Sequence, residues 1–236
     1  MEAILETRNL TKRFGAFPAL SDVNICIGSG RIVGLLGANG SGKTTLIKLA
    51  NGLLTPTEGE ILIGGVKPGT QTKRIVSYLP DRTYFDNWMK VKDCLKLFAD
   101  FYEDFNIAKA GDMLLALGID ADKPFRSLSK GTKEKVQLVL VMSRSAHLYL
   151  LDEPIGGVDP AARDYILNTI IRNYNEEGTV IISTHLIADI EKVLDDVIFL
   201  MNGRVERVSS VDAIRAASGK SVDEVFREVI RCEVKF

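Results

Sequence analysis

The stretch from Gly37 to Thr44 reads Gly-Ala-Asn-Gly-Ser-Gly-Lys-Thr and matches the pattern GxxxxGK[ST] at every fixed position. An apolar run, Ile32 to Leu36, precedes it, and a helical pattern, Lys43 to Ala50, follows. In such a strand, loop and helix order, glycines let backbone N–H groups and the helix N-terminus converge on a phosphate. The sequence therefore predicts a nucleotide-phosphate loop whose contacts come from Gly37, Ala38, Asn39, Gly40, Ser41, Gly42, Lys43, Thr44 and Thr45.

Within this loop, two side chains have distinct expected tasks. Lys43 is expected to reach the β- and γ-phosphates, and Thr44 to place its hydroxyl on Mg²⁺. These two tasks predict a nucleoside triphosphate together with Mg²⁺.

A second motif, which is acidic, lies about a hundred residues further along the chain. The apolar run Leu148 to Leu151 ends in the adjacent carboxylates Asp152 and Glu153. Because side chains alternate along a strand, two consecutive acids at its end cannot share one task. Asp152 is expected to hold Mg²⁺ through its waters, while Glu153 orients and deprotonates an attacking water. The pair predicts hydrolysis rather than binding alone.

Composition excludes several other classes. Of the 236 residues, 46% are apolar and 26% are charged, as in folded globular domains, and the net charge is −1. No overall field would draw the chain to nucleic acid. The longest purely apolar run, Leu138 to Met142, is far below the roughly 20 residues that span a bilayer. We therefore expect a cytoplasmic chain that reaches a membrane only through a partner.

Strand and helix patterns alternate along most of the chain, which favours a parallel sheet covered by helices. Arg74 to Leu79 is predicted to be one of the strands, and Asn202-Gly203 predicts a hairpin. Between them, Met89 to Phe105 has an amphipathic helical period whose aromatic residues we expect in a core. These aromatic residues are Phe98, Phe101, Tyr102 and Phe105. His147 has no partner in motif spacing, and we expect it to be structural.

Three further short motifs complete an ordered series. They are Leu128-Ser129-Lys130-Gly131-Thr132 before an apolar helix, Gly157-Val158-Asp159 after the acidic pair, and Ser183-Thr184-His185. With the phosphate loop and the acidic strand, this order resembles the ATP-binding cassette (ABC) ATPases over roughly residues 4–205. The Leu-Ser-x-Gly element some twenty residues before the Asp-Glu pair separates that family from other phosphate-loop NTPases.

The resemblance implies an α/β fold and one ABC ATPase domain over residues 1–236. That fold has a P-loop NTPase core with a parallel sheet, an N-terminal antiparallel β subdomain and an inserted helical subdomain. The expected boundaries are 1–80 and 146–205 for the nucleotide-binding core with its β subdomain, 82–145 for the helical insert and 206–236 for a short C-terminal extension.

It also implies a composite site, because two such cassettes stack head to tail in the family. Ser129 and Gly131 would cap the nucleotide on the other cassette, where the N-terminus of the following helix suits a γ-phosphate. His185 would contact the γ-phosphate and hold Glu153, and Asp159 would lie in the loop between the subunits. Phe14 stands where the family places a ring that stacks on adenine, with an ordinary core phenylalanine as the alternative.

The sequence departs from the family at two places. Lys130 and Thr132 replace the usual first glycine and glutamine of the signature, and Lys130 could approach a phosphate or point to solvent. Asp81 stands where the family usually has a glutamine that senses Mg²⁺. Asp81 could bind the metal through water, or it could pair with Arg82 and leave the metal alone.

The segments 152–160 and 222–226 look like bacterial exporter ATPases, including those linked to peptide antibiotic resistance. The resemblance thus implies an ATPase subunit on the inner face of the cell membrane that powers a separately encoded membrane subunit. Its partners would be that subunit and a second ABC ATPase subunit, identical or related, without nucleic acid. Two alternatives stay open: an ABC-type ATPase acting on a non-membrane partner, and a nucleotide-gated module with little turnover.

Overall fold

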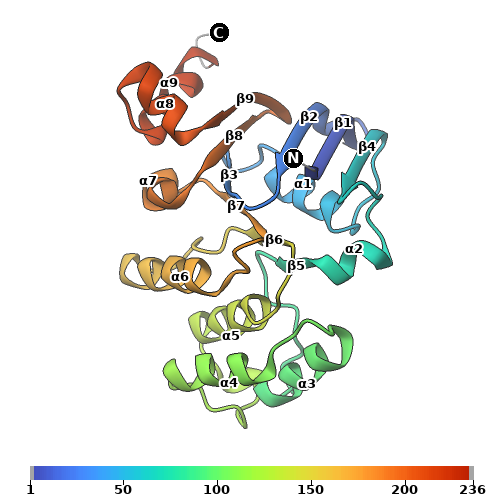
Figure 1. Cartoon of the computed structure of the whole chain (residues 1–236), viewed down its shortest axis with the longest axis vertical. Helices are drawn as coiled ribbons and strands as arrows, with labels where there is room; N and C mark the ends of the chain where they lie inside the picture. Colours follow the sequence, from blue (N-terminus) through green and yellow to red (C-terminus); the bar gives the residue numbers. More distant parts are fainter. Residues whose placement is uncertain (1–2, 234–236) are drawn as a thin grey trace.

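The computed structural model describes residues 3–233, except for the side chains at positions 161, 162, 232 and 233. Its centre is a six-stranded sheet in the order β5-β6-β7-β3-β8-β9, parallel except for the edge strand β9 (Figure 1). The strands are β5 Val76–Leu79, β6 Leu148–Asp152, β7 Thr179–Thr184, β3 Ile32–Leu36, β8 Asp196–Met201 and β9 Arg204–Ser210. The predicted hairpin at Asn202-Gly203 is confirmed as the β8–β9 turn.

This sheet is apolar on both faces because both faces are covered. In β3, Ile32 and Leu36 pack into one hydrophobic cluster, and Val33 and Leu35 pack into another on the opposite face. The first face meets the helices α5 Lys130–Met142, α6 Pro160–Asn173, α7 Ile187–Ile190 with the 3-10 turn Glu191–Val193, α8 Val211–Ser218 and α9 Val222–Glu233. The second face meets α1, Lys43–Ala50, and a smaller sheet (Figure 1).

The smaller sheet is antiparallel and has the order β2-β1-β4. Its strands are β1 Ala3–Phe14, β2 Phe17–Gly28 and β4 Glu58–Ile63. Their inward residues share a core with α1 and with the central sheet. Helix α1 is therefore enclosed between the two sheets, which fixes the phosphate loop at its start.

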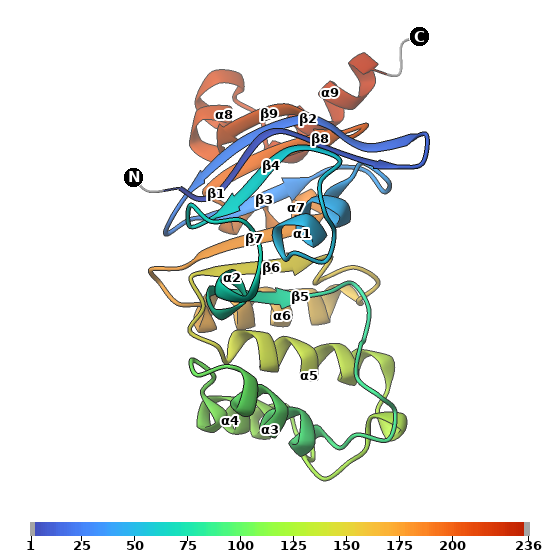
Figure 2. The same ribbon diagram turned by 90° about the vertical axis from the view of Figure 1, so that its right-hand side faces the viewer.

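A helical layer lies beyond the β5 edge and occupies the lower part of Figures 1 and 2. It contains α3 Val91–Phe101, α4 Ile107–Ala116, the 3-10 turn Phe125–Ser127 and α5 Lys130–Met142. Helix α5 is buried on two sides, since Leu138 and Met142 pack toward the sheet while Val136 and Leu140 pack toward α3 and α4. The nearly all-round apolar middle of this helix is thus explained by its place between two cores.

Two sequence expectations need correction, and one helix was not expected. The first two residues of the predicted strand Arg74 to Leu79 are the end of α2, Thr70–Ile75, where Thr72 accepts the Gly69 N–H at 2.9 Å. Of the aromatic residues expected in a core, Phe98 is buried but Phe101 is 73% exposed. Helix α8, Val211–Ser218, was not predicted; it packs with α9, Val222–Glu233, against the central sheet, and positions 234–236 of the expected extension lie outside the described residues.

Arg144, which is 2% exposed, ties the helical layer to the sheet. Its guanidinium donates to both Asp104 oxygens (Nε to Oδ1, 2.9 Å) and to the carbonyls of Arg74 and Val76, at 2.6 and 2.5 Å. The same group lies 3.8 Å from the centroid of the Tyr102 ring. The Arg144 side chain therefore donates hydrogen bonds to one carboxylate and two carbonyl groups at once, which requires the several N–H donors of a planar guanidinium.

We predict that Arg144→Leu lowers the free energy of unfolding by about 3–5 kcal/mol, because it leaves a half-buried carboxylate and two carbonyls without donors. Urea denaturation followed by circular dichroism measures the loss. Arg227→Ala is the matched control, since it breaks only the exposed pair with Asp223 and should change the free energy by less than about 1 kcal/mol. Equal stability of the Arg144→Leu protein and the wild type would contradict this account.

Candidate functional site

The phosphate loop lies at the carboxyl end of β3 and leads into α1. Side chains at two of its glycines would collide with the fold: a Cβ at Gly37 would lie 2.3 Å from the Leu200 carbonyl oxygen, and one at Gly42 would lie 2.6 Å from that of Ala19. Gly42 also has φ +106°, a region that favours glycine. The loop is held from outside by Gly203, whose N–H donates to the Ser41 carbonyl at 3.0 Å.

Lys43 lies across this loop, 5% exposed. Its Nζ donates to the carbonyl oxygens of Gly37 at 2.8 Å and Ala38 at 3.2 Å, and it lies 3.3 Å from Glu153 Oε1. The ammonium group is thus directed into the curl of the loop, where its charge faces backbone carbonyls and one carboxylate. A phosphate entering the loop would compete for that charge.

Asp152 ends β6 beside the loop and is 1% exposed. Its Oδ1 accepts hydrogen bonds from Ser183 Oγ at 2.6 Å and Thr44 Oγ1 at 3.1 Å, whereas its buried Oδ2 has no hydrogen-bond partner among the described residues. Burial raises the pKa of Asp152, the two hydroxyls oppose that rise, and the charges of Asp81 and Glu153 add to it.

That unpartnered oxygen is the observation that tests the predicted Mg²⁺ site. A buried carboxylate oxygen without a donor is costly, and a cation would satisfy it. Within residues 3–233, no three His, Cys, Asp or Glu side chains gather into a metal cluster of their own. Mg²⁺ in phosphate-transfer sites is held by one or two carboxylates together with the substrate's phosphates, so Asp152 and Thr44 fit this metal.

Glu153 follows Asp152 with a left-handed backbone, φ +50°, which is uncommon for a residue with a side chain. Its N–H donates to the Ser183 carbonyl oxygen and to Ser183 Oγ, both at 3.1 Å. Its carboxylate contacts His185 Nδ1 at 3.1 and 3.2 Å and Lys43 Nζ at 3.3 Å. The structure therefore brings together the three residues predicted to be catalytic.

The remaining predicted site residues lie at the surface. Phe14 is 49% exposed at the end of β1, so the alternative of a core phenylalanine is wrong, and Lys12 Nζ lies 5.3 Å from its ring centroid. Ser129 and Gly131 form the exposed tip of α5, where Ser129 Oγ caps the Thr132 N–H at 3.2 Å. Asp159 is exposed just before α6.

Lys130 and Asp81, the two departures from the family, can be placed as well. The Lys130 side chain is 82% exposed, its Nζ lies 3.9 Å from Glu134, and the residue also lines a cavity that Glu153 borders. Asp81 lies 3.7 Å from Arg82 in a weak, exposed pair. Asp81 also borders, with Asp152, the same cavity, which has a volume of about 320 Å³.

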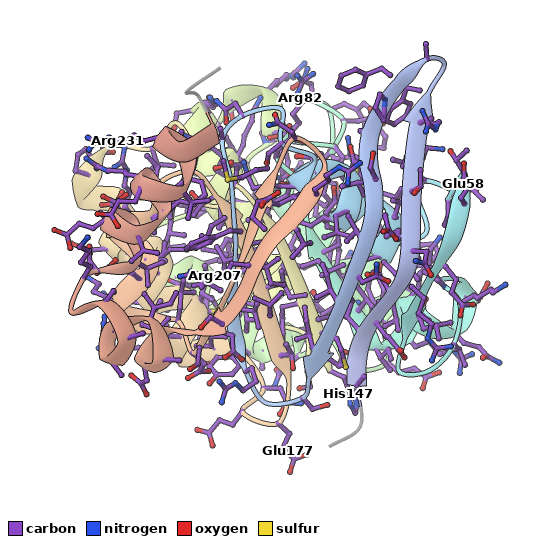
Figure 3. The ribbon with its side chains drawn as sticks, turned by 90° about the horizontal axis from the view of Figure 1, so that it is seen from above. Glu58, Arg82, His147, Glu177, Arg207 and Arg231 are labelled. Carbon is purple, nitrogen blue, oxygen red and sulfur yellow. The ribbon has the colours of Figure 1, made fainter. Side chains whose placement is uncertain are left out.

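The sheet explains why these residues converge. Residues at the carboxyl ends of parallel strands meet at one edge, and Arg82, just after β5, lies at that edge in Figure 3. His147 and Glu177 precede β6 and β7 and lie at the opposite edge (Figure 3). His147 therefore stands apart from the phosphate loop.

Sequence reasoning missed two contributors. Ser183 contacts both Asp152 and the backbone of Glu153, and its position in the Ser183-Thr184-His185 motif was the available signal. Gln137 borders the same cavity as Asp81 and Asp152 from α5, and a lone polar residue in a buried helical run was the signal for it.

Comparison with known proteins agrees with this geometry. The family profile "ABC transporter" matches residues 20–156. The ABC transporter ATP-binding protein YtrB of Bacillus subtilis is 31% identical over 90% of this chain and 74% of its own length. An uncharacterized ABC transporter ATP-binding protein of Methanocaldococcus jannaschii, MJ1023, is 32% identical over 91% of this chain and 80% of its own.

Among solved structures, an ATP-binding subunit of an ABC transporter superposes with a TM-score of 0.83 at 30% identity, covering 96% of this chain and 99% of that one. The dimeric structure of MJ0796, a bacterial ABC transporter cassette, has a TM-score of 0.76 at 23% identity, covering 87% and 98%, and shares the fold. Given the matched profile, these relatives and the cluster at the end of β6, the chain belongs to the ABC transporter family as one of its ATP-binding, ATP-hydrolysing cassettes.

Proposed function

We propose that this chain is the ATP-hydrolysing subunit of a bacterial exporter and that it drives a separately encoded membrane subunit from the inner face of the cell membrane. The observation that carries the hydrolytic part is the Glu153 carboxylate held between Lys43 and His185 beside the phosphate loop. The resemblance of segments 152–160 and 222–226 to bacterial exporter ATPases supports the exporter, and relatives from Bacillus subtilis named as ABC transporter ATP-binding proteins support a transporter subunit.

The proposed hydrolysis uses residues already in contact. The loop amides and Lys43 bind the β- and γ-phosphates, Phe14 stacks on adenine, and Thr44 and Asp152 hold Mg²⁺, with Asp81 as a further carboxylate. The metal supplies charge neutralisation to the phosphates. When a bound phosphate attracts Lys43 away from Glu153, the Glu153 carboxylate still contacts His185 and accepts the proton of the attacking water. The water oxygen would bond to the γ-phosphorus as the bond from that phosphorus to the β-phosphate oxygen breaks, and ADP would leave.

A second cassette completes the proposed site. Ser129 and Gly131 lie exposed at the tip of α5 rather than packed inside their own chain, so the helix N-terminus is open to another molecule. Asp159 is exposed as well and is proposed to lie at the same interface. The geometry supports a head-to-tail dimer in which each signature acts on the partner's nucleotide.

A surface groove on this chain is the proposed docking site for the membrane subunit. A hollow of about 620 Å³ lies between α3 and the β5 edge, and it joins exposed apolar side chains to a cationic rim. Phe101 and Leu53 are 73% and 53% exposed there, and the rim includes Lys48 and Lys73. Within residues 3–233, no helix has the length and apolar character to cross a bilayer. A short amphipathic helix of the membrane subunit fits such a groove.

We predict that Lys43→Ala abolishes ATP binding, whereas Glu153→Gln keeps binding and stops steady phosphate release. Equilibrium dialysis with labelled ATP and a multiple-turnover phosphate assay separate the two effects. Loss of turnover in Glu153→Gln would exclude the low-turnover module only if the wild type releases phosphate steadily. Unchanged nucleotide affinity in Lys43→Ala would refute the phosphate-loop assignment.

The composite site predicts complementation between two inactive proteins. Lys43→Ala spoils the phosphate loop and Ser129→Glu the signature, so each protein alone should be nearly inactive. Mixed dimers regain one intact site if the signature acts across the interface, and ATPase activity should then return on mixing. If each signature served its own chain, the mixture would stay inactive.

Affinity capture from detergent-solubilised native membranes tests the exporter. We predict that an integral membrane protein co-purifies with the wild type and that Phe101→Glu reduces its recovery, while ATP hydrolysis by the isolated chain is retained. Leu115→Glu is the control, since Leu115 is 80% exposed on α4 and does not line the groove. Recovery of ribosomal or DNA-bound proteins in place of a membrane protein would favour the non-membrane alternative.

A further inference from the structure

Gln137 is a polar side chain in a stretch of α5 that is otherwise apolar and buried, Val136 to Met142. It is 1% exposed. Its Oε1 accepts the backbone N–H of Tyr84 at 3.3 Å. A buried amide without a hydrogen-bond partner is costly, whereas an apolar side chain at this position would need no such partner. The hydrogen bond from Tyr84 to Gln137 therefore indicates a specific role for the glutamine.

The bond joins α5 to the stretch 81–90, which we name the Asp81 segment. Further contacts fix the same segment: Lys133 Nζ donates to Asn87 Oδ1 at 3.3 Å, and the Arg126 N–H donates to the Asn87 carbonyl at 2.9 Å. Lys133 lies one turn before Gln137 on the helix that begins next to Ser129. The Asp81 segment is therefore held along the first turns of α5, which we call the signature helix because Ser129 caps it.

The cavity of about 320 Å³ shows what this arrangement connects. Asp81 borders it from the segment, Glu134 and Gln137 border it from α5, and Asp152 and Glu153 border it from the end of β6. Gln137 thus stands on the wall that α5 contributes, opposite the carboxylates of the phosphate site. Asp81 is thereby connected to α5 through the bond to Tyr84, three residues further on.

We propose that Gln137 is a positioning residue that keeps the Asp81 segment at a fixed distance from the signature helix, so that Asp81 at the metal site and Ser129 at the dimer face move as one unit. The proposal rests on the proposed function, in which Asp81 faces the metal. It makes Gln137 responsible for relaying the state of the nucleotide site to the dimer face.

The chain carries a reporter for this coupling. Its single tryptophan, Trp88, belongs to the Asp81 segment and is 71% exposed. Trp88 neighbours Asn87, whose side chain contacts Lys133. Tryptophan fluorescence of the full chain therefore follows the segment directly and does not depend on turnover.

The test titrates Mg²⁺ into the protein with saturating ADP and follows Trp88 emission in the wild type, Gln137→Met, Asp81→Asn and the double variant. Methionine keeps the length of the side chain and removes the acceptor. We expect Gln137→Met to raise the half-saturating Mg²⁺ concentration about five-fold, the factor that one lost hydrogen bond produces. ATPase assays should show a lower kcat with KM for ATP nearly unchanged, because the phosphate loop is untouched.

Leu138→Met is the matched control, because it borders the same cavity and loses no hydrogen bond, so its titration should follow that of the wild type. The double variant should need no more Mg²⁺ than Asp81→Asn alone, since Gln137 acts through Asp81. Asn87→Ala cuts the exposed contact with Lys133 without touching the core, and should shift the titration in the same direction by a smaller factor.

Three results would overturn the proposal. The first is a wild-type Trp88 emission that does not change with Mg²⁺ and ADP, and the second is a Gln137→Met titration equal to that of Leu138→Met. The third is a double variant whose half-saturating Mg²⁺ concentration rises by the product of the two single-variant factors. Failure of the proposed function has a different signature. There, the wild type would not hydrolyse ATP, or Lys43→Ala would bind nucleotide as before.

Discussion

The parallel pairing of β6, β7 and β3 is the constraint on which the site depends. Backbone hydrogen bonds place Asp152 beside Ser183 and Leu36 beside Thr184, so the phosphate loop, the acidic pair and His185 must leave the sheet at one edge. The apolar character of these strands on both faces holds that register, because a slip by one residue would exchange the two cores. The two hydrophobic cores, which lie away from the site, therefore fix the positions of the side chains predicted to be catalytic.

Within this frame, single interactions set the state of the carboxylates. Ser183 and Thr44 satisfy one oxygen of Asp152, the other oxygen has no donor among the described residues, and Lys43 and His185 both contact Glu153. The two acids are adjacent in sequence but differ in environment. Asp152 is 1% exposed and accepts from two hydroxyls, whereas the Glu153 side chain is 19% exposed and contacts Lys43 and His185. Their separate tasks follow from this difference.

Much of the fold and most of the site could be predicted from sequence. The phosphate loop predicted its strand and helix, α1 at Lys43–Ala50, because glycine positions and apolar runs are local signals. The α2 turn could not be read in the same way, since Arg74 and Ile75 suit a strand as well as a helix and the choice depends on the Thr72 contact with Gly69. The exposure of Phe101 and the bond from Gln137 to Tyr84 depend on how α3 and α5 meet the sheet, which no local pattern states.

The turn at Asn202-Gly203 closes the β8–β9 hairpin and also contacts the phosphate loop. Gly203 gives its N–H to Ser41 and receives that of Ser21 at 2.8 Å, and a Cβ there would lie 2.8 Å from the Ala19 carbonyl oxygen. The chain that leads to α8 and α9 therefore starts at Gly203, which is hydrogen-bonded to the phosphate loop. Because β9 pairs with β8 from Arg204 to Ser210, a probe attached to those last helices is connected to the phosphate loop through paired strands.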